Sequence, residues 1–102
     1  MSKIAFLGPK ALVLPLGASG LETFACETTA QAKKTFSTLV EKEDFAIIFI
    51  TERLAAEMLE EIELAEEKDI NIMVLPDHRG STGLFKERIE KLIKKATGAL
   101  RV

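Results

Sequence analysis

Two kinds of hydrophobic pattern alternate along the chain. Short runs that are apolar almost throughout predict strands covered on both faces, because a strand with one wet face alternates apolar and polar residues. Longer segments with an apolar residue every three or four positions predict amphipathic helices. The runs predict strands at residues 3–8, 21–26, 45–50 and 70–75, the second of which alternates only loosely. The periodic segments predict helices at residues 29–42, between Thr51 and Ala65, and at residues 84–97.

Strands that alternate with helices predict an α/β fold with a parallel sheet and helices on both faces. Right-handed crossovers leave few topologies, and of these we predict a four-stranded, flavodoxin-like sheet in the order 2-1-3-4. Residues 10–19 predict no clear element, because Pro15 interrupts any helix there and nearby glycines weaken it. We expect a globular α/β domain at residues 1–76, a flexible loop at residues 77–83 and a C-terminal amphipathic helix at residues 84–102 that can detach.

The same pattern assigns the helix starts and the core. Thr28 or Thr29 is placed to cap the first helix, and Thr51 to cap the second. The stripes expected to face the core are Ala32, Phe36, Leu39 and Val40 in the first helix and Leu54, Met58, Leu59, Ile62 and Ala65 in the second. The predicted globular core comprises Ile4, Phe6, Phe36, Leu39, Ile47, Ile48, Phe49, Ile72 and Val74.

The composition is that of a single globular domain. Of 102 residues, 47% are apolar and 29% are charged, and no apolar run approaches the ~18 residues that a membrane span needs. We therefore expect no direct insertion into a membrane. The chain enters a strand directly after Met-Ser, without a leader pattern, and its single cysteine rules out an intrachain disulfide. These features predict a cytoplasmic location.

Charge is distributed unevenly along the chain. Residues 41–69 hold eleven acidic side chains against three basic ones, whereas residues 84–102 hold six basic side chains against two acidic ones. A basic terminal helix is one mark of nucleic-acid binding. However, the chain has no Trp or Tyr to stack on bases, and the acidic segment would repel phosphates, so we expect no nucleic-acid partner.

The ends of the predicted strands carry little that could do chemistry. Ligands of doubly wound sheets bind beyond these carboxyl ends, which here are Gly8-Pro9-Lys10, Ile50-Thr51-Glu52 and Leu75-Pro76-Asp77. A phospho-receiver domain would need clustered acids after the first strand and an aspartate after the third, and the chain has neither. The dinucleotide-binding fingerprint is also missing, because the first loop has one glycine followed by a proline that has no N–H.

The other candidate groups are isolated in the sequence. His78 is the only histidine and lacks the partners of a catalytic triad or a metal site. Cys26 has no basic neighbour, which favours a buried apolar role, and the glutamates at 57–67 fit a solvated helix face. Gly80-Ser81-Thr82-Gly83 lacks the lysine of a phosphate-binding loop, so we interpret it as a turn that caps the last helix. We therefore predict no catalytic residue, no cofactor and no metal.

Three motifs follow one another along the chain. It opens with Lys3-Ile4-Ala5-Phe6-Leu7-Gly8, its third strand runs into Thr51, Glu52, Leu54 and Ala55, and its fourth ends on Pro76, with Gly80 and Ala96-Thr97-Gly98 beyond. In this order and spacing they resemble the F subunit of V-type (archaeal or vacuolar-type) ATPases and ATP synthases, over nearly the whole chain. One stretch departs from that family, which usually has acidic Gly-Asp-x-Asp-Thr-Val where residues 8–13 are Gly-Pro-Lys-Ala-Leu-Val. This chain has no acidic side chain at those positions with which to make the contacts that the family makes there.

The resemblance implies a non-catalytic rotor protein. The F subunit of that family lies in the central stalk, packs on the coiled-coil D subunit and helps couple ATP turnover in the catalytic head to rotation of the membrane ring. Its C-terminal helix runs along the partner and changes position. Here the 4-3-4 spacing of one apolar stripe fits a helix–helix seam. The predicted interface is Phe85, Ile89, Leu92 and Ala96, with Arg88, Lys91 and Lys95 as the charges for an acidic partner, and the predicted hinge is Gly80 and Gly83.

A second hypothesis comes from another functional class. The same scaffold could carry a small-ligand or phosphoryl-group regulatory module, in the manner of a phosphotransfer-system component. Such a module needs a nucleophilic His or Cys at a strand end. Cys26 is the only candidate, and it lacks basic neighbours. Binding tests with nucleotides and phospho-donors distinguish the two hypotheses.

Overall fold

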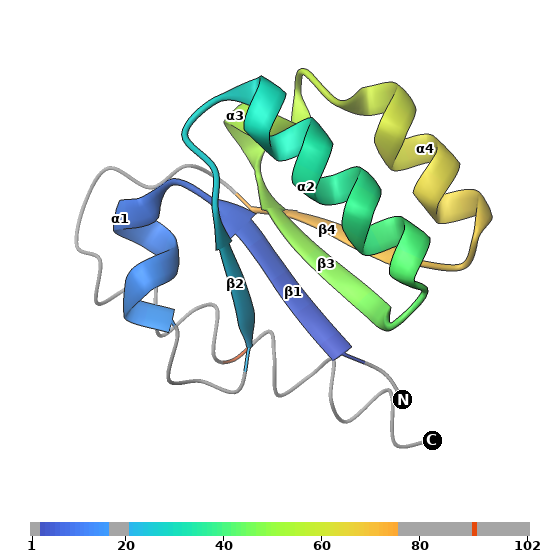
Figure 1. Ribbon diagram of the computed structural model, residues 1–102, viewed down its shortest axis with the longest axis horizontal. Coiled ribbons are helices and arrows are strands. Elements are labelled where there is room, and N and C mark those ends of the chain that lie inside the picture. The colour runs from blue at the N-terminus through green and yellow to red at the C-terminus, as the bar shows by residue number, and fades with distance from the viewer. Residues whose placement is uncertain (1–2, 17–20, 76–90, 92–102) are drawn as a thin grey trace.

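A four-stranded parallel sheet forms the body of the protein. In the computed structural model, which describes residues 3–16, 21–75 and 91, the strand order is β2-β1-β3-β4, as the sequence predicts (Figure 1). All three pairings between neighbouring strands are parallel. The strands are β1 (Lys3–Gly8), β2 (Glu22–Ala25), β3 (Phe45–Thr51) and β4 (Asn71–Leu75).

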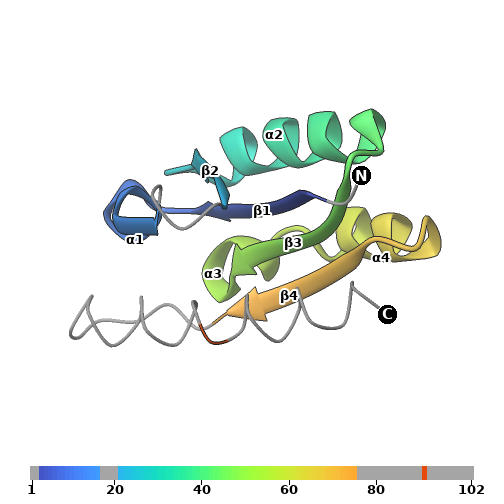
Figure 2. The ribbon, with the colours of Figure 1, turned by 90° about the horizontal axis from the view of Figure 1, so that it is seen from below.

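Helices lie on both faces of this sheet. Figure 1 shows α2 and α4 side by side over one face, and Figure 2 shows α1 beside the carboxyl end of β1. The helical segments are α1 (Lys10–Val13), the 3-10 turn η1 (Leu14–Leu16), α2 (Thr29–Lys42), α3 (Glu52–Ala55) and α4 (Leu59–Glu67). The short helix α1 follows Pro9, whose fixed φ suits a helix start, and Pro15 lies within the 3-10 turn. This stretch had no clear assignment from the sequence.

The central strand β3 separates two clusters of buried side chains. Ile48 and Ile50 face α2, α3 and α4, whereas Ile47 and Phe49 belong to the cluster that includes α1 and η1. This arrangement confirms the prediction that a continuous apolar run is a strand covered on both faces. Six of the nine predicted core residues are buried: Phe6, Phe36, Leu39, Ile47, Ile48 and Phe49.

The core prediction is weaker on the edge strand β4 and at the start of β1. Ile4 and Ile72 are only half-buried, and Val74 is 49% exposed, so its assignment to the core is wrong. Strand β4 is an edge strand, with a neighbouring strand on one side only. Side chains on an edge strand are covered less completely than those at the centre.

The single helix predicted after Thr51 is two helices. Tight turns, with Glu57 N–H donating to Leu54 and Met58 N–H to Ala55, end α3 and bring Met58 into the core before α4 begins. Leu59 is 62% exposed, so its assignment to the buried stripe is wrong. Successive side chains of an α-helix are rotated by about 100° about the helix axis. Leu59 therefore lies at the side of the buried stripe and not within it.

At two helix ends, a residue other than glycine adopts the left-handed backbone conformation, with positive φ. Glu43 follows α2 with φ 54°, and Asp69 follows α4 with φ 63°. At α4, Ile70 N–H donates to Ala65 and Asp69 N–H to Glu66, the pair of bonds that defines a Schellman motif. The position of Asp69 is one that glycine normally fills.

Asp69→Gly should raise the free energy of unfolding by roughly 0.5–1 kcal/mol, because glycine adopts positive φ without steric strain. Chemical denaturation measures the change. Asp69→Ala is the matched control and should not stabilise, since alanine keeps the strained backbone. Equal stabilisation by both variants would show that removal of the carboxylate, not relief of strain, is responsible.

Candidate functional site

The carboxyl edge between β1 and β3 is where a sheet of this topology would bind a ligand. At this edge Gly8, the last residue of β1, packs closely against two side chains of the same chain. A Cβ placed on Gly8 would lie 2.8 Å from Cε1 of Phe6 and 3.0 Å from Cγ2 of Thr51, closer than a side chain tolerates. Glycine at this position therefore serves close packing of the two strands and the following helix.

The start of α1 is bound by a carboxylate of the same chain. Lys10 N–H donates to Oε1 of Glu27 at 2.7 Å. Glu27 N–H in turn donates to Oε1 of Gln31 at 2.9 Å, and Gln31 N–H donates to Oγ1 of Thr28 at 3.2 Å. An anionic ligand at this helix start would have to displace Glu27.

The cap on α2 agrees with one of the two alternatives from the sequence. Thr28, and not Thr29, is the capping residue. The Thr28-x-x-Gln31 spacing is that of a capping box, and this spacing is visible in the sequence. The contact of Glu27 with Lys10 was missed, because the two residues are 17 positions apart and only the folded sheet brings them together.

Thr51 occupies the N-cap position of α3, as the sequence predicts. Its side chain, however, makes no capping hydrogen bond. The side chain is fully buried, and within the described part of the chain no group pairs with its Oγ1. Its methyl group faces Gly8. Packing against β1 decides the orientation of this side chain.

Thr51→Val should have a free energy of unfolding equal to that of the wild type or higher, with a gain of at most about 1–3 kcal/mol. The substitution removes a buried hydroxyl that has no partner and keeps the methyl group that packs. Urea denaturation of both proteins gives the difference. The control Thr51→Ser keeps the hydroxyl and removes the methyl, so it should destabilise. A loss above about 1 kcal/mol for the valine variant would show that the hydroxyl is hydrogen-bonded in solution.

Cys26 lies at the carboxyl end of β2 in a setting that suppresses thiolate formation. The residue is buried, and burial raises the pKa of its thiol. A hydrogen bond with Thr35 acts in the opposite direction, while the negative charge of Glu27 raises the pKa further. The protonated thiol is a poor nucleophile, so the surroundings of Cys26 do not favour the phosphoryl-transfer hypothesis.

Metal-ligand clusters and membrane-spanning helices are both missing from the described residues. No cluster of three His, Cys, Asp or Glu side chains suited to a metal ion occurs in these segments. None of the helices described combines the length and apolar character needed to cross a membrane. His78 lies outside the described residues.

The acidic side chains predicted to form a solvated helix face lie on α4 and just before it. Glu57, Glu60, Glu63, Glu66 and Glu67 are exposed, and Glu61 is half-buried. Oε2 of Glu61 lies 3.7 Å from Nζ of Lys33, an ion pair between α4 and α2. The predicted solvated face is confirmed.

Most of the predicted partner interface and hinge lies outside the described part of the chain. Lys91 is helical and exposed. The residues outside are Phe85, Arg88, Ile89, Leu92, Lys95 and Ala96 of the interface, and Gly80 and Gly83 of the hinge. Their roles remain predictions from the sequence.

Comparison with known proteins gives one consistent result. The family model described as ATP synthase (F/14-kDa) subunit matches residues 4–93. The F subunit of the V-type ATP synthase of Fusobacterium nucleatum is 34% identical over 100 residues, covering 97% of this chain and 94% of the relative. The F subunit of the A-type ATP synthase of Thermococcus kodakarensis is 36% identical over 101 residues, covering 94% of each chain.

A third relative agrees with these two. The F subunit of the V-type ATP synthase of Clostridium botulinum is 33% identical over 97 residues, covering 94% of this chain and 93% of the relative. The matches cover nearly all of the chain and of each relative. The chain therefore belongs to the F-subunit family of V/A-type ATP synthases.

Proposed function

We propose that this chain is a non-catalytic rotor subunit of a V/A-type ATP synthase. It lies in the central stalk, peripheral to the membrane, and helps couple ATP turnover in the catalytic head to ion transport. Family membership supports the assignment to the complex. The observation that carries the non-catalytic role is at the carboxyl edge of the sheet, where Glu27 already binds the Lys10 N–H and Gly8 packs against Phe6 and Thr51.

The partner that we propose is the coiled-coil D subunit of the central stalk. Phe85, Ile89, Leu92 and Ala96 follow the spacing by which one helix lies along another. Arg88, Lys91 and Lys95 add positive charge, which suits an acidic partner surface. Gly80 and Gly83 precede this helix and allow the backbone to change direction. In the free chain the helix packs on its own domain at least part of the time, and in the complex it docks on the D subunit.

Deleting the gene in the host tests this role directly. Membranes lacking the chain should hydrolyse ATP with impaired ATP-driven ion uptake, and expression of the wild-type chain should restore uptake. Purified chain titrated with ATP in a calorimeter should show no binding at micromolar concentration. Unchanged ion uptake in the deletion strain would contradict the coupling role, whereas micromolar ATP affinity would contradict the prediction that the chain has no nucleotide site.

A further inference from the structure

A groove separates α2 and α4 on the outer surface of the domain. The two helices lie side by side over the sheet (Figure 1), and the groove between them encloses about 520 Å³. Its lining comes from both helices and the turn after α4: Phe36, Ser37, Val40, Glu41, Glu61, Leu64, Ala65, Glu67 and Lys68. These lining residues differ from those at the carboxyl edge of the sheet and from those of the predicted C-terminal seam.

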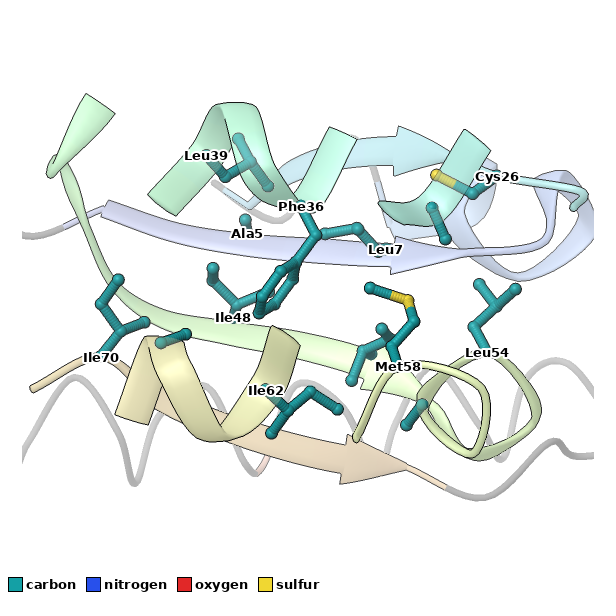
Figure 3. Close-up of a cluster of buried hydrophobic side chains, with 14 of the residues drawn as sticks. Ala5, Leu7, Cys26, Phe36, Leu39, Ile48, Leu54, Met58, Ile62 and Ile70 are labelled. Carbon is teal, nitrogen blue, oxygen red and sulfur yellow. The ribbon is translucent and has the colours of Figure 1, made fainter. Parts of the chain in front are cut away.

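The floor of the groove is apolar. Phe36 and Ala65 are almost completely buried, and Val40 is half-buried. Figure 3 shows Phe36 pointing from α2 toward the sheet, near Ile48, so the core closes the bottom of the groove. Leu64 lines the same groove yet is 61% exposed. A single exposed leucine is common, but one beside an apolar hollow offers a contact for another side chain.

The rim of the groove is acidic. Glu41, Glu61 and Glu67 line it, against a single basic residue, Lys68. The ion pair of Glu61 with Lys33 spans 3.7 Å between half-exposed side chains, so solvent screens it and it can rearrange at little cost. The fold thus places part of the acidic segment seen in the sequence around an apolar hollow.

We propose that this groove docks a basic amphipathic helix from another protein chain. An apolar floor with charged walls is the surface on which helix-in-groove recognition depends. Apolar residues of the incoming helix pack on Leu64 and Val40, and its Lys or Arg side chains pair with Glu41, Glu61 and Glu67. The proposal concerns the globular domain alone and does not rest on the predicted contact with the D subunit.

The first test uses the isotope-labelled full-length chain and a synthetic amphipathic helix of leucine and lysine. We expect amide shifts that concentrate on the residues lining the groove. Leu64→Asp should weaken binding by roughly tenfold or more, since it places a charge in the apolar contact. Leu14→Asp is the matched control, because Leu14 is also 61% exposed but lies on η1, and it should bind like the wild type.

Charge is tested separately from shape. Replacing Glu41, Glu61 and Glu67 with glutamine should weaken binding, whereas Glu52→Gln with Glu57→Gln should not. A scrambled leucine–lysine peptide, with the same charge but no apolar face, should bind far more weakly. Equal binding of the scrambled peptide, or unchanged binding to Leu64→Asp, would overturn the proposal. Contacts of Leu64 with residues 84–102 in the free chain would also overturn it, because the groove would then hold the protein's own segment.

The assembled ATP synthase provides the final test. A photo-crosslinking residue at position 64 should react with a basic helical segment of another chain in the complex, and one at position 14 should not react with that segment. Assembly of the complex without any cross-link from position 64 would overturn the proposal. A cross-link to an acidic segment would overturn it equally.

Discussion

Ile48→Ala should lower the free energy of unfolding by about 2–5 kcal/mol, the usual cost of emptying a packed aliphatic site. Ile48 is fully buried on the central strand β3, between β1 and β4. Figure 3 shows its side chain in the cluster that Phe36 and Ile62 enter from the covering helices. Little can move inward to fill the cavity, because strands on both sides and helices above hold the site open.

Val74→Ala provides the comparison, measured in the same chemical denaturation experiment. Val74 projects from the same face of the sheet but lies on the edge strand and is 49% exposed. Its truncation should therefore cost much less than that of Ile48. A loss below about 1 kcal/mol for Ile48→Ala would mean that β3 is not the centre of the core.

The contrast between Ile48 and Val74 shows which features of the fold the hydrophobic pattern can predict and which it cannot. An apolar run predicts a strand, and the order of strands follows from crossover rules, so the topology could be predicted. The run does not reveal how well each strand end is covered, because coverage depends on where the neighbouring helices stop. Val74 was therefore assigned to the core on the same grounds as Ile48, and only one assignment is confirmed.

The errors around α3 and α4 have a related cause. Apolar residues at helical spacing predicted one helix, and Met58 is indeed buried. The turn before α4 depends on backbone geometry, with Met58 at φ −132° and ψ 27°, and no proline or glycine marks it in the sequence. Thr51 was predicted to cap because its residue type favours that role. It occupies the N-cap position, but packing against Gly8 fixes its side chain in another orientation.

Sequence reasoning was correct for Cys26, whose role depends on its immediate surroundings, but it did not find a surface formed by two separate helices. Sequence reasoning gave a buried, apolar role for Cys26, and the raised pKa of its thiol agrees with that role. Sequence reasoning did not find the groove between α2 and α4, because its lining comes from two groups of residues in separate helices, at 36–41 and 61–68. The acidic residues of 41–69 were visible as a charge asymmetry, but only the fold shows which of them border an apolar surface.

Leu92→Asp should abolish association with the D subunit while leaving the four-stranded core folded. Leu92 is predicted to lie in the middle of the apolar seam, between Ile89 and Ala96. An aspartate there would bring an unpaired charge into a desolvated contact, which is among the most damaging changes at an interface. The four described strands all come from residues 3–75, so the substitution changes no residue of these strands.

Two measurements separate loss of association from loss of folding. Calorimetry measures binding of the purified variant to the D subunit, and circular dichroism on heating measures whether the core is folded. Thr97→Asp is the control, because this position lies outside the 4-3-4 stripe and should retain binding. Wild-type affinity in Leu92→Asp would show that the seam is assigned to the wrong residues. Global unfolding of Leu92→Asp would instead make the C-terminal segment an integral part of the core. In that case Gly80 and Gly83 could not serve as a hinge that releases the helix, because detachment would expose the interior of the sheet to water.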